Sequence, residues 1–268
     1  MRWRAAWMFA NVTMIVEERN PSHISAQAFH VSAIRCQSDK PVTANLLRGA
    51  FGASLRAISL EGYQRYFAPE NTGSGPSGYR DSPRPFVFRL NQPGLVQMNV
   101  FTSAQNALDL FCEALMGVRF LRSEACSIEQ LCLPLAPGAA ASNIRVSFVT
   151  ATELKGADEP QFGVLFARMR DRISTLRALW GEGPLEIDFR ELGQRAEAIQ
   201  MSRCELRRHE DRRTSKNTGQ RHPLSGFMGT AEYHGNLGEF LPYLEIARYT
   251  GVGRQTVWGK GEIGYETF

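Results

Sequence analysis

Two cations stand among closely spaced glycines near the C-terminus, and together they could bind phosphate. The stretch GVGRQTVWGKGEIG, residues 251–264, contains Arg254 and Lys260. Gly251 and Gly253 lack a side chain, so the N–H groups around them can approach an anion closely. We therefore expect this loop to hold a phosphate group through Gly251, Gly253, Arg254 and Lys260. A glycine-rich turn without a ligand is the alternative that the stretch alone leaves open.

A second basic feature is the segment 190–221, which carries nine cations and five acids. Its excess of four positive charges equals the net charge of the whole chain, +4, so positive charge is concentrated there. The spacing of its arginines fits one helix face, which predicts a long polar helix from about residue 190 to residue 215. We expect its cations to bind nucleic acid; these are Arg203, Arg207, Arg208, Arg212, Arg213 and Lys216. A solvated helix with internal salt bridges is the alternative.

Composition narrows the class of protein. Of the 31 basic residues 27 are arginine, which favours phosphate and base recognition, although a GC-rich genome would give the same bias. Five cysteines without a CxxC spacing predict reduced, mostly buried thiols and a cytoplasmic location. The sequence contains no apolar run long enough to span a membrane and no HExxH or paired Cys/His spacing. We therefore expect no membrane association, no metal site and no cofactor.

The order of helical and strand patterns predicts an α+β fold with two similar halves. Strands are expected at 26–36, at two short segments within 85–102, around 125–135, at 143–154, at 184–189, at 224–235 and at the C-terminus. Helices are expected at 43–59, 104–118, 160–181 and 237–251. Each half approximates β-α-β-β-α-β, which is the ferredoxin-like arrangement. We therefore predict tandem ferredoxin-like units at 21–138 and 139–268, after an N-terminal extension at 1–20. The second unit would carry the arginine-rich helix 190–221 as an extension.

Several motifs together resemble one family. LRGAFG lies at 47–52, GFMG at 226–229 and FLPYL at 240–244, and these precede GVGRQT at 251–256 and GKG at 259–261. This combination resembles the CRISPR-associated RAMP-superfamily endoribonucleases that process precursor CRISPR RNA. The arginine-rich segment looks most like the compact type IV variants.

The resemblance implies an enzyme that binds CRISPR repeat RNA hairpins and stays bound to the mature product, with other CRISPR effector subunits as partners. Cleavage would use the 2′-OH of the RNA without a metal and leave a 2′,3′-cyclic phosphate. A non-catalytic subunit that binds CRISPR RNA is the alternative. Many members carry a histidine between the first strand and the first helix, but CQSDKPVTANLLRG, residues 36–49, has none.

The family architecture would bring Arg35, Arg48 and Arg254 toward the cleft between the two units, where they could stabilise the charged phosphorane. Arginine does not act as a base. His30, on the first strand, is therefore the candidate general acid or base. Structural salt bridges are the alternative roles for Arg35 and Arg48, and ordinary packing is the alternative for His30.

Overall fold

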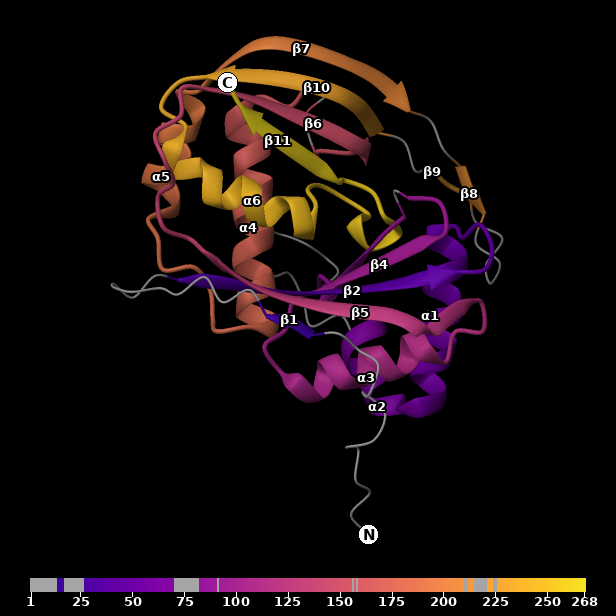
Figure 1. The fold of residues 1–268 in the computed structure, drawn as a ribbon. Coiled ribbons are helices and arrows are strands. Elements are labelled where there is room, and N and C mark those ends of the chain that lie inside the picture. The colour runs from indigo at the N-terminus through magenta and orange to yellow at the C-terminus, as the bar shows by residue number, and fades with distance from the viewer. Residues whose placement is uncertain are drawn as a thin grey trace.

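A computed structural model describes residues 14–16, 27–69, 82–90, 92–155, 157, 159–209, 212–214, 221–223 and 226–268. Two ferredoxin-like units lie on top of each other in four layers (Figure 1). From top to bottom in this view, these are the C-terminal sheet, its helices, the N-terminal sheet and its helices. The predicted fold class, α+β with tandem ferredoxin-like units, is confirmed.

The N-terminal unit follows the β-α-β-β-α-β order, and its sheet has the strand order β1-β5-β2-β4-β3. Its elements are β1 (Met14–Val16), β2 (Ala28–Ser38), α1 (Ala44–Ile58), α2 (Leu60–Gly62), a π-helical turn (Tyr63–Phe67), β3 (Phe86–Arg89), β4 (Leu95–Val100), α3 (Gln105–Met116) and β5 (Leu121–Pro134). β1 pairs in parallel with β5, and the other neighbours are antiparallel. Thr43 caps α1, because its hydroxyl accepts a hydrogen bond from the Leu46 N–H at 3.2 Å.

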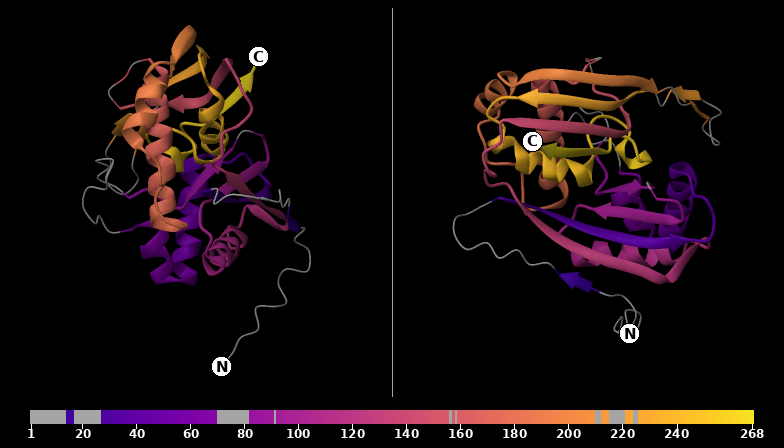
Figure 2. Two further views of the ribbon diagram at one scale, coloured as in Figure 1. Left: turned by 90° about the vertical axis from the view of Figure 1, so that its left-hand side faces the viewer. Right: turned by 45° about the horizontal axis from the view of Figure 1, so that its top comes forward.

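The C-terminal unit repeats the same topology with the strand order β11-β6-β10-β7. Its elements are β6 (Asn143–Thr152), α4 (Phe162–Trp180), α5 (Phe189–Glu197), β7 (Gln200–His209), β8 (Arg212–Thr214), β9 (Arg221–Pro223), β10 (Gly226–His234), a 3-10 turn (Gly238–Phe240), α6 (Leu241–Thr250), a second 3-10 turn (Thr256–Trp258) and β11 (Ile263–Thr267). β8 and β9 form a two-stranded sheet that continues the β7–β10 hairpin (Figure 2).

Both faces of the N-terminal sheet are buried. Ile34 and Cys36 pack with α1 and α3, whereas Phe29 and Val31, with the opposite strand parity, pack into the core of the C-terminal unit. The C-terminal sheet instead covers α4 and α6 with one face and leaves the other on the outside (Figure 1). The junction of the two units is therefore part of one continuous core, which fixes residues from both units relative to each other.

The prediction of an arginine-rich helix at 190–221 is wrong. α5 ends at Glu197, and residues 200–209 form the edge strand β7, which pairs antiparallel with β10. The tertiary pairing overrides the helical spacing of the arginines, because an edge strand can carry charge on both faces. The likeness to type IV variants rested on that helix and loses this support.

Two smaller predictions also fail. Residues 184–189 form no strand; Asp188 instead caps α5, where it accepts hydrogen bonds from the N–H groups of Arg190 and Glu191 at 3.0 and 2.8 Å. The prediction that the cysteines are reduced and mostly buried also fails. Cys36 and Cys126 stand opposite each other in β2 and β5 and form a disulfide, while Cys132 and Cys204 are exposed.

Candidate nucleic-acid interface

The glycine-rich loop runs from the end of α6 to the start of β11 and folds back on itself. The Val252 N–H donates to the Gly261 carbonyl at 2.8 Å, and the Gly261 N–H donates to the Ala151 carbonyl at 3.0 Å. Gly251, Gly253, Gly259 and Gly261 all have φ between 68° and 78°. A β-carbon at Gly253 would collide with the Glu153 carbonyl, and one at Gly261 with the Val252 carbonyl. Glycine is therefore required at these two positions because another backbone segment of the same chain passes close to each of them.

The same loop rests on the N-terminal unit. A β-carbon at Gly259 would lie 3.5 Å from the Phe88 carbonyl and 3.8 Å from the Ala44 β-carbon, so β3 and the first turn of α1 are its neighbours. Arg48 of α1 has its guanidinium carbon 4.3 Å from the centroid of the Trp258 ring and 4.4 Å from that of Phe67. A guanidinium between two rings is attracted by both of them. Arg48 thus joins α1 to the glycine-rich loop.

Arg254 points outward from this loop. Its side chain is 59% exposed and its Nη1 lies 2.8 Å from Oε1 of Glu153. Exposed ion pairs contribute only about 0–1 kcal/mol, so this pair is weak enough to be exchanged for a phosphate contact. Lys260 is half-buried in the same loop. Arg254 and Lys260 therefore both belong to the loop that Arg48 contacts at the junction of the two units.

Arg35 is held at a different point of the junction. Its Nη1 lies 2.7 Å from Oε2 of Glu129, and its Nε donates to Oε1 of Gln97 at 3.0 Å. Gln97 donates in turn to Asn99 at 2.7 Å, and Asn99 donates to the Tyr249 carbonyl of α6 at 3.0 Å. The structural salt bridge named as its alternative role is thus present, and the catalytic role of Arg35 stays a prediction.

His30 lies away from Arg35 and from the start of α1. The two residues are five positions apart in β2, so their side chains point to opposite faces and their Cα atoms are about 16 Å apart. Nε2 of His30 lies 3.3 Å from Oε1 of Glu182, in the loop that follows α4. The four proposed catalytic residues do not converge on one point, and the catalytic role of His30 stays a prediction.

The predicted arginine contacts now lie along a strand and a hairpin. Arg203 and Arg207 share the outer face of the C-terminal sheet. Arg208 pairs with Phe227 and belongs to the opposite face of the strand. All three side chains are exposed, and Arg203 is paired with Glu205 at 2.5 Å.

The remaining predicted contacts continue that hairpin. The backbones of Arg212 and Arg213 form β8, while Lys216 lies outside the described residues. The cations therefore follow the edge strand β7 and its extension β8, and their contact with nucleic acid stays a prediction.

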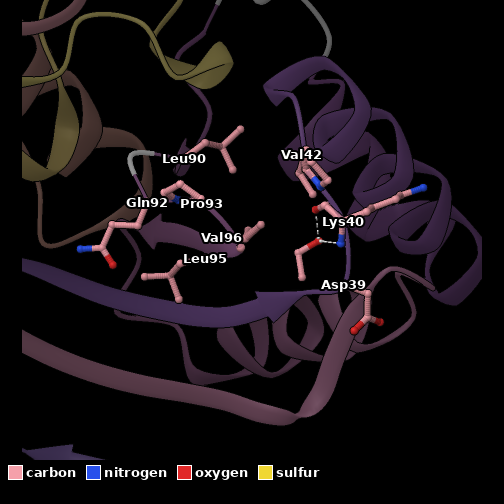
Figure 3. Close-up of a pocket in the computed structure, with 11 residues that line it drawn as sticks. Asp39, Lys40, Val42, Leu90, Gln92, Pro93, Leu95 and Val96 are labelled. Atoms are coloured by element: carbon pink, nitrogen blue, oxygen red, sulfur yellow. Dashed lines mark hydrogen bonds between the residues drawn. The ribbon is translucent and has the colours of Figure 1, made fainter.

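A pocket of about 610 Å³ opens beside the point where the glycine-rich loop touches α1 and β3 (Figure 3). Val42 and Leu90 form part of its wall. Val42 is two positions before Ala44 in the sequence, and Leu90 is two positions after Phe88; Ala44 and Phe88 are the neighbours of Gly259. Figure 3 shows that the Lys40 side chain points away from Val42 and Leu90. The remaining lining residues are Ser38, Asp39, Lys40, Pro41, Gln92, Pro93, Gly94, Leu95 and Val96.

Hydrogen bonds hold the rim of this pocket in place. The Ser38 hydroxyl donates to the Lys40 carbonyl at 2.8 Å, and the Ser38 N–H donates to the Gly94 carbonyl at 2.8 Å. The size of the pocket and its largely apolar wall suit a small organic group. Sequence reasoning missed it because its two walls, 38–42 and 90–96, are far apart in the chain. The apolar residues inside these turn-like segments were the available signal.

Within the described ranges, no three His, Cys, Asp or Glu side chains are grouped so that they could hold a metal ion. None of the helices in the described part of the chain is long and apolar enough to cross a membrane.

Two ferredoxin-like units are thus stacked on each other, and the glycine-rich loop lies at their junction. The family model described as CRISPR-associated endoribonuclease Cas6 matches residues 146–263, from β6 to the start of β11. This match covers most of the C-terminal unit and agrees with the resemblance that the motifs indicated. No curated protein matches the chain.

Solved structures share the fold over nearly the whole chain. The Cas6 chain of a product complex is 17% identical to the protein; the match covers 90% of the protein and 100% of the Cas6 chain, with a TM-score of 0.60. Thermus thermophilus Cas6 is 18% identical; the match covers 91% of the protein and 100% of the Thermus chain, with a TM-score of 0.58. A partial Cas6-RT-Cas1–Cas2 complex contains a chain that is 11% identical. The match covers 91% of the protein and 47% of the chain in the complex, with a TM-score of 0.54.

Proposed function

We propose that the chain is an endoribonuclease that cuts CRISPR repeat RNA hairpins into mature CRISPR RNA. The observation that carries the proposal is the placement of Arg254 and Lys260 in a glycine-rich loop that Arg48 contacts, in a unit matched by the Cas6 family model. RNA phosphates are bound by clustered cations. The similar solved proteins include Cas6 in a product complex and in a substrate mimic complex, which supports the same role here.

The proposed reaction needs no metal. The 2′-oxygen attacks the adjacent phosphorus and its proton passes to a base; the bond from phosphorus to the 5′-oxygen breaks, and that oxygen takes up a proton. The products are a 2′,3′-cyclic phosphate and a 5′-hydroxyl. Arg254 and Lys260 would stabilise the charge that develops on the phosphorane oxygens. Proton transfer at the loop would fall to solvent, because His30 lies away from the start of α1; a role for His30 would need a cleavage point nearer to Glu182. Arg35 and Arg48 would be further electrostatic contributors.

We propose that RNA lies across both units. The cations of β7 and β8, from Arg203 to Arg213, would bind the phosphates of the hairpin stem. An unpaired nucleotide beside the stem would place its base in the pocket between Val42 and Leu90. The enzyme would act in the cytoplasm, where repeat transcripts arise, and would keep its product for other CRISPR proteins. The likeness to a chain of a Cas6-RT-Cas1–Cas2 complex supports such partners.

One observation favours the alternative, a subunit that binds CRISPR RNA without cutting it. His30 is engaged with Glu182 near the start of β2, whereas the loop to α1 follows Ser38 at the other end of that strand. A general base is therefore missing from the segment where many family members have one.

A cleavage assay separates the two functions. The protein is incubated with labelled repeat RNA in EDTA, and the 3′ ends of the products are analysed. Discrete cleavage with a cyclic phosphate is expected. A 2′-deoxy nucleotide at the cleavage site should abolish the reaction, because the attacking oxygen is then absent. Tight binding with intact RNA would instead establish the non-catalytic subunit.

A further inference from the structure

A buried arginine crosses from the N-terminal sheet to the glycine-rich loop. Arg89 is the last residue of β3, an edge strand, and its side chain is 4% exposed. It has the same strand parity as Val87, which packs into the core of the C-terminal unit. Burying a guanidinium is costly unless its charge and its N–H groups are compensated. The partners of Arg89 therefore show what this residue is placed to hold.

Arg89 and Asn99 cap the end of α6 from the other unit. Nη2 of Arg89 donates to the Tyr249 carbonyl at 3.3 Å, and Nδ2 of Asn99 donates to the same oxygen at 3.0 Å. Arg172 of α4 donates to the next carbonyl, that of Thr250, at 3.0 Å. The last carbonyls of a helix lack partners inside the helix, and cations are favourable there. The direction in which the chain leaves α6 is thus set partly by the N-terminal sheet.

The same guanidinium contacts both ends of the glycine-rich loop. A β-carbon at Gly251, the first loop residue, would lie 2.9 Å from Nη2 of Arg89. At the far end, Oε2 of Glu262 lies 3.7 Å from Nε of Arg89. Glu262 is itself fixed on β6, because its N–H donates to the Thr150 hydroxyl at 3.0 Å. Burial lowers the pKa of Arg89 and the Glu262 carboxylate raises it, as expected for a charge that depends on this partner.

We propose that Arg89 is a positioning residue, which holds both ends of the glycine-rich loop so that Arg254 and Lys260 face bound RNA. Asn99 assists it, and the hydrogen-bond chain from Arg35 through Gln97 orients Asn99. The catalytic consequence rests on the proposed function, whereas the structural consequence does not.

Hydrogen exchange of the loop amides tests the structural part in the free protein. Arg89→Met keeps the bulk of the side chain but removes its donors. We expect the Val252 and Gly261 N–H groups to exchange at least about tenfold faster in this variant, because the backbone bonds of the loop open more often. Core amides of β6 and β10 should exchange at the wild-type rate. Arg89→Lys, which restores the charge without the fork, should exchange at an intermediate rate.

Arg177→Met is the matched control. Arg177 is also buried and also crosses the junction, since its Nη1 donates to Gln27 at 3.0 Å and its Nη2 lies 3.8 Å from Glu182. Among the residues that the structure describes, its side-chain partners are Gln27 and Glu182, outside the loop, so loop exchange should stay within about twofold of wild type. If Arg89→Met does not fold, Glu262→Gln removes the same ion pair and should speed loop exchange about threefold. Unchanged loop exchange, or equal acceleration in the control, would overturn the proposal.

Single-turnover cleavage tests the catalytic part. Arg89→Met should cut bound RNA about tenfold more slowly while its affinity stays within about twofold, because only the placement of the cations changes. A loosened loop with an unchanged rate would refute the positioning role in catalysis. If the wild-type protein does not cut RNA, the proposed function fails, and the exchange data still decide whether Arg89 holds the loop.

Discussion

Arg48 and Trp258 are 210 positions apart in the chain, yet the guanidinium carbon of Arg48 lies 4.3 Å from the centroid of the Trp258 ring. Arg48 belongs to α1 of the N-terminal unit, and Trp258 belongs to the glycine-rich loop of the C-terminal unit. This contact fixes one side of the loop to α1, and Arg89 fixes its two ends. The loop is therefore held by the N-terminal unit as well as by β6 of its own unit.

Trp258→Ala should loosen this contact and weaken RNA cleavage. Removing a ring from a partly buried guanidinium costs about 1–2 kcal/mol, which denaturant unfolding can measure. We expect cleavage to slow because the loop loses its support on α1. Trp258→Phe keeps a ring of smaller size and should retain most of the stability and the activity. Equal losses in both variants would show that packing volume, and not the cation–ring contact, holds the loop.

Arg254→Ala tests the assignment of Arg254 to the transition state. Removing one preorganised charge of this kind slows the chemical step about 10²- to 10³-fold, so we expect that loss in single-turnover assays at saturating RNA. RNA affinity should change by less than about threefold, because many other phosphate contacts remain. Arg254→Lys should recover part of the rate.

Arg248→Ala serves as the control for Arg254, because Arg248 is also exposed and paired with a glutamate, Glu245, at 2.9 Å. It lies in α6 outside the glycine-rich loop and should cleave at the wild-type rate. Wild-type cleavage by Arg254→Ala would remove Arg254 from the mechanism.

Neutralising Arg207 and Arg208 tests the strand β7 as a stem-binding element. Each phosphate contact contributes about 0.9 to the slope of log K against log salt for duplex nucleic acid, so the double alanine variant should lower that slope by about 2. Fluorescence anisotropy with a repeat hairpin at several salt concentrations measures it. Arg195→Ala is the control, because Arg195 is exposed in α5 and bonded to Glu239 at 2.8 Å. An unchanged slope in the double variant would mean that β7 is a solvated edge.

The sequence predicted the order of elements well but the arginine segment poorly. α1, α4 and α6 have apolar residues at helical spacing, and β10 alternates, so their local patterns agree with the tertiary fold. β7 has few buried residues, and charges at 203, 207 and 208 fit a helix face as well as a strand. Its strand form comes from pairing with β10, which no local pattern shows.

Contacts across the junction of the two units could not be predicted either, because no local sequence pattern shows them. The motifs indicated that Arg48 and Arg254 belong near one site, and the loop does bring Arg48 to the glycines. The partners of Arg35 and Arg89 could not be predicted, because Arg89 and Tyr249 are 160 residues apart. The density of glycine was noticed, but its cause was not: Gly253 and Gly261 make room for carbonyls of the chain itself.

Filling the pocket with Val42→Trp tests whether it receives a base. A base held in such a site contributes about 1–3 kcal/mol, so the variant should bind repeat RNA with an unpaired flank at least about fivefold more weakly. An RNA without the base at that flanking position should bind wild type more weakly by a similar factor. It should bind Val42→Trp no more weakly than intact RNA does, because the two changes remove the same contact. Val149→Trp, at an exposed position of β6, is the control and should behave as wild type. Additive losses would mean that the base lies elsewhere, and an effect on protein partners alone would assign the pocket to another subunit.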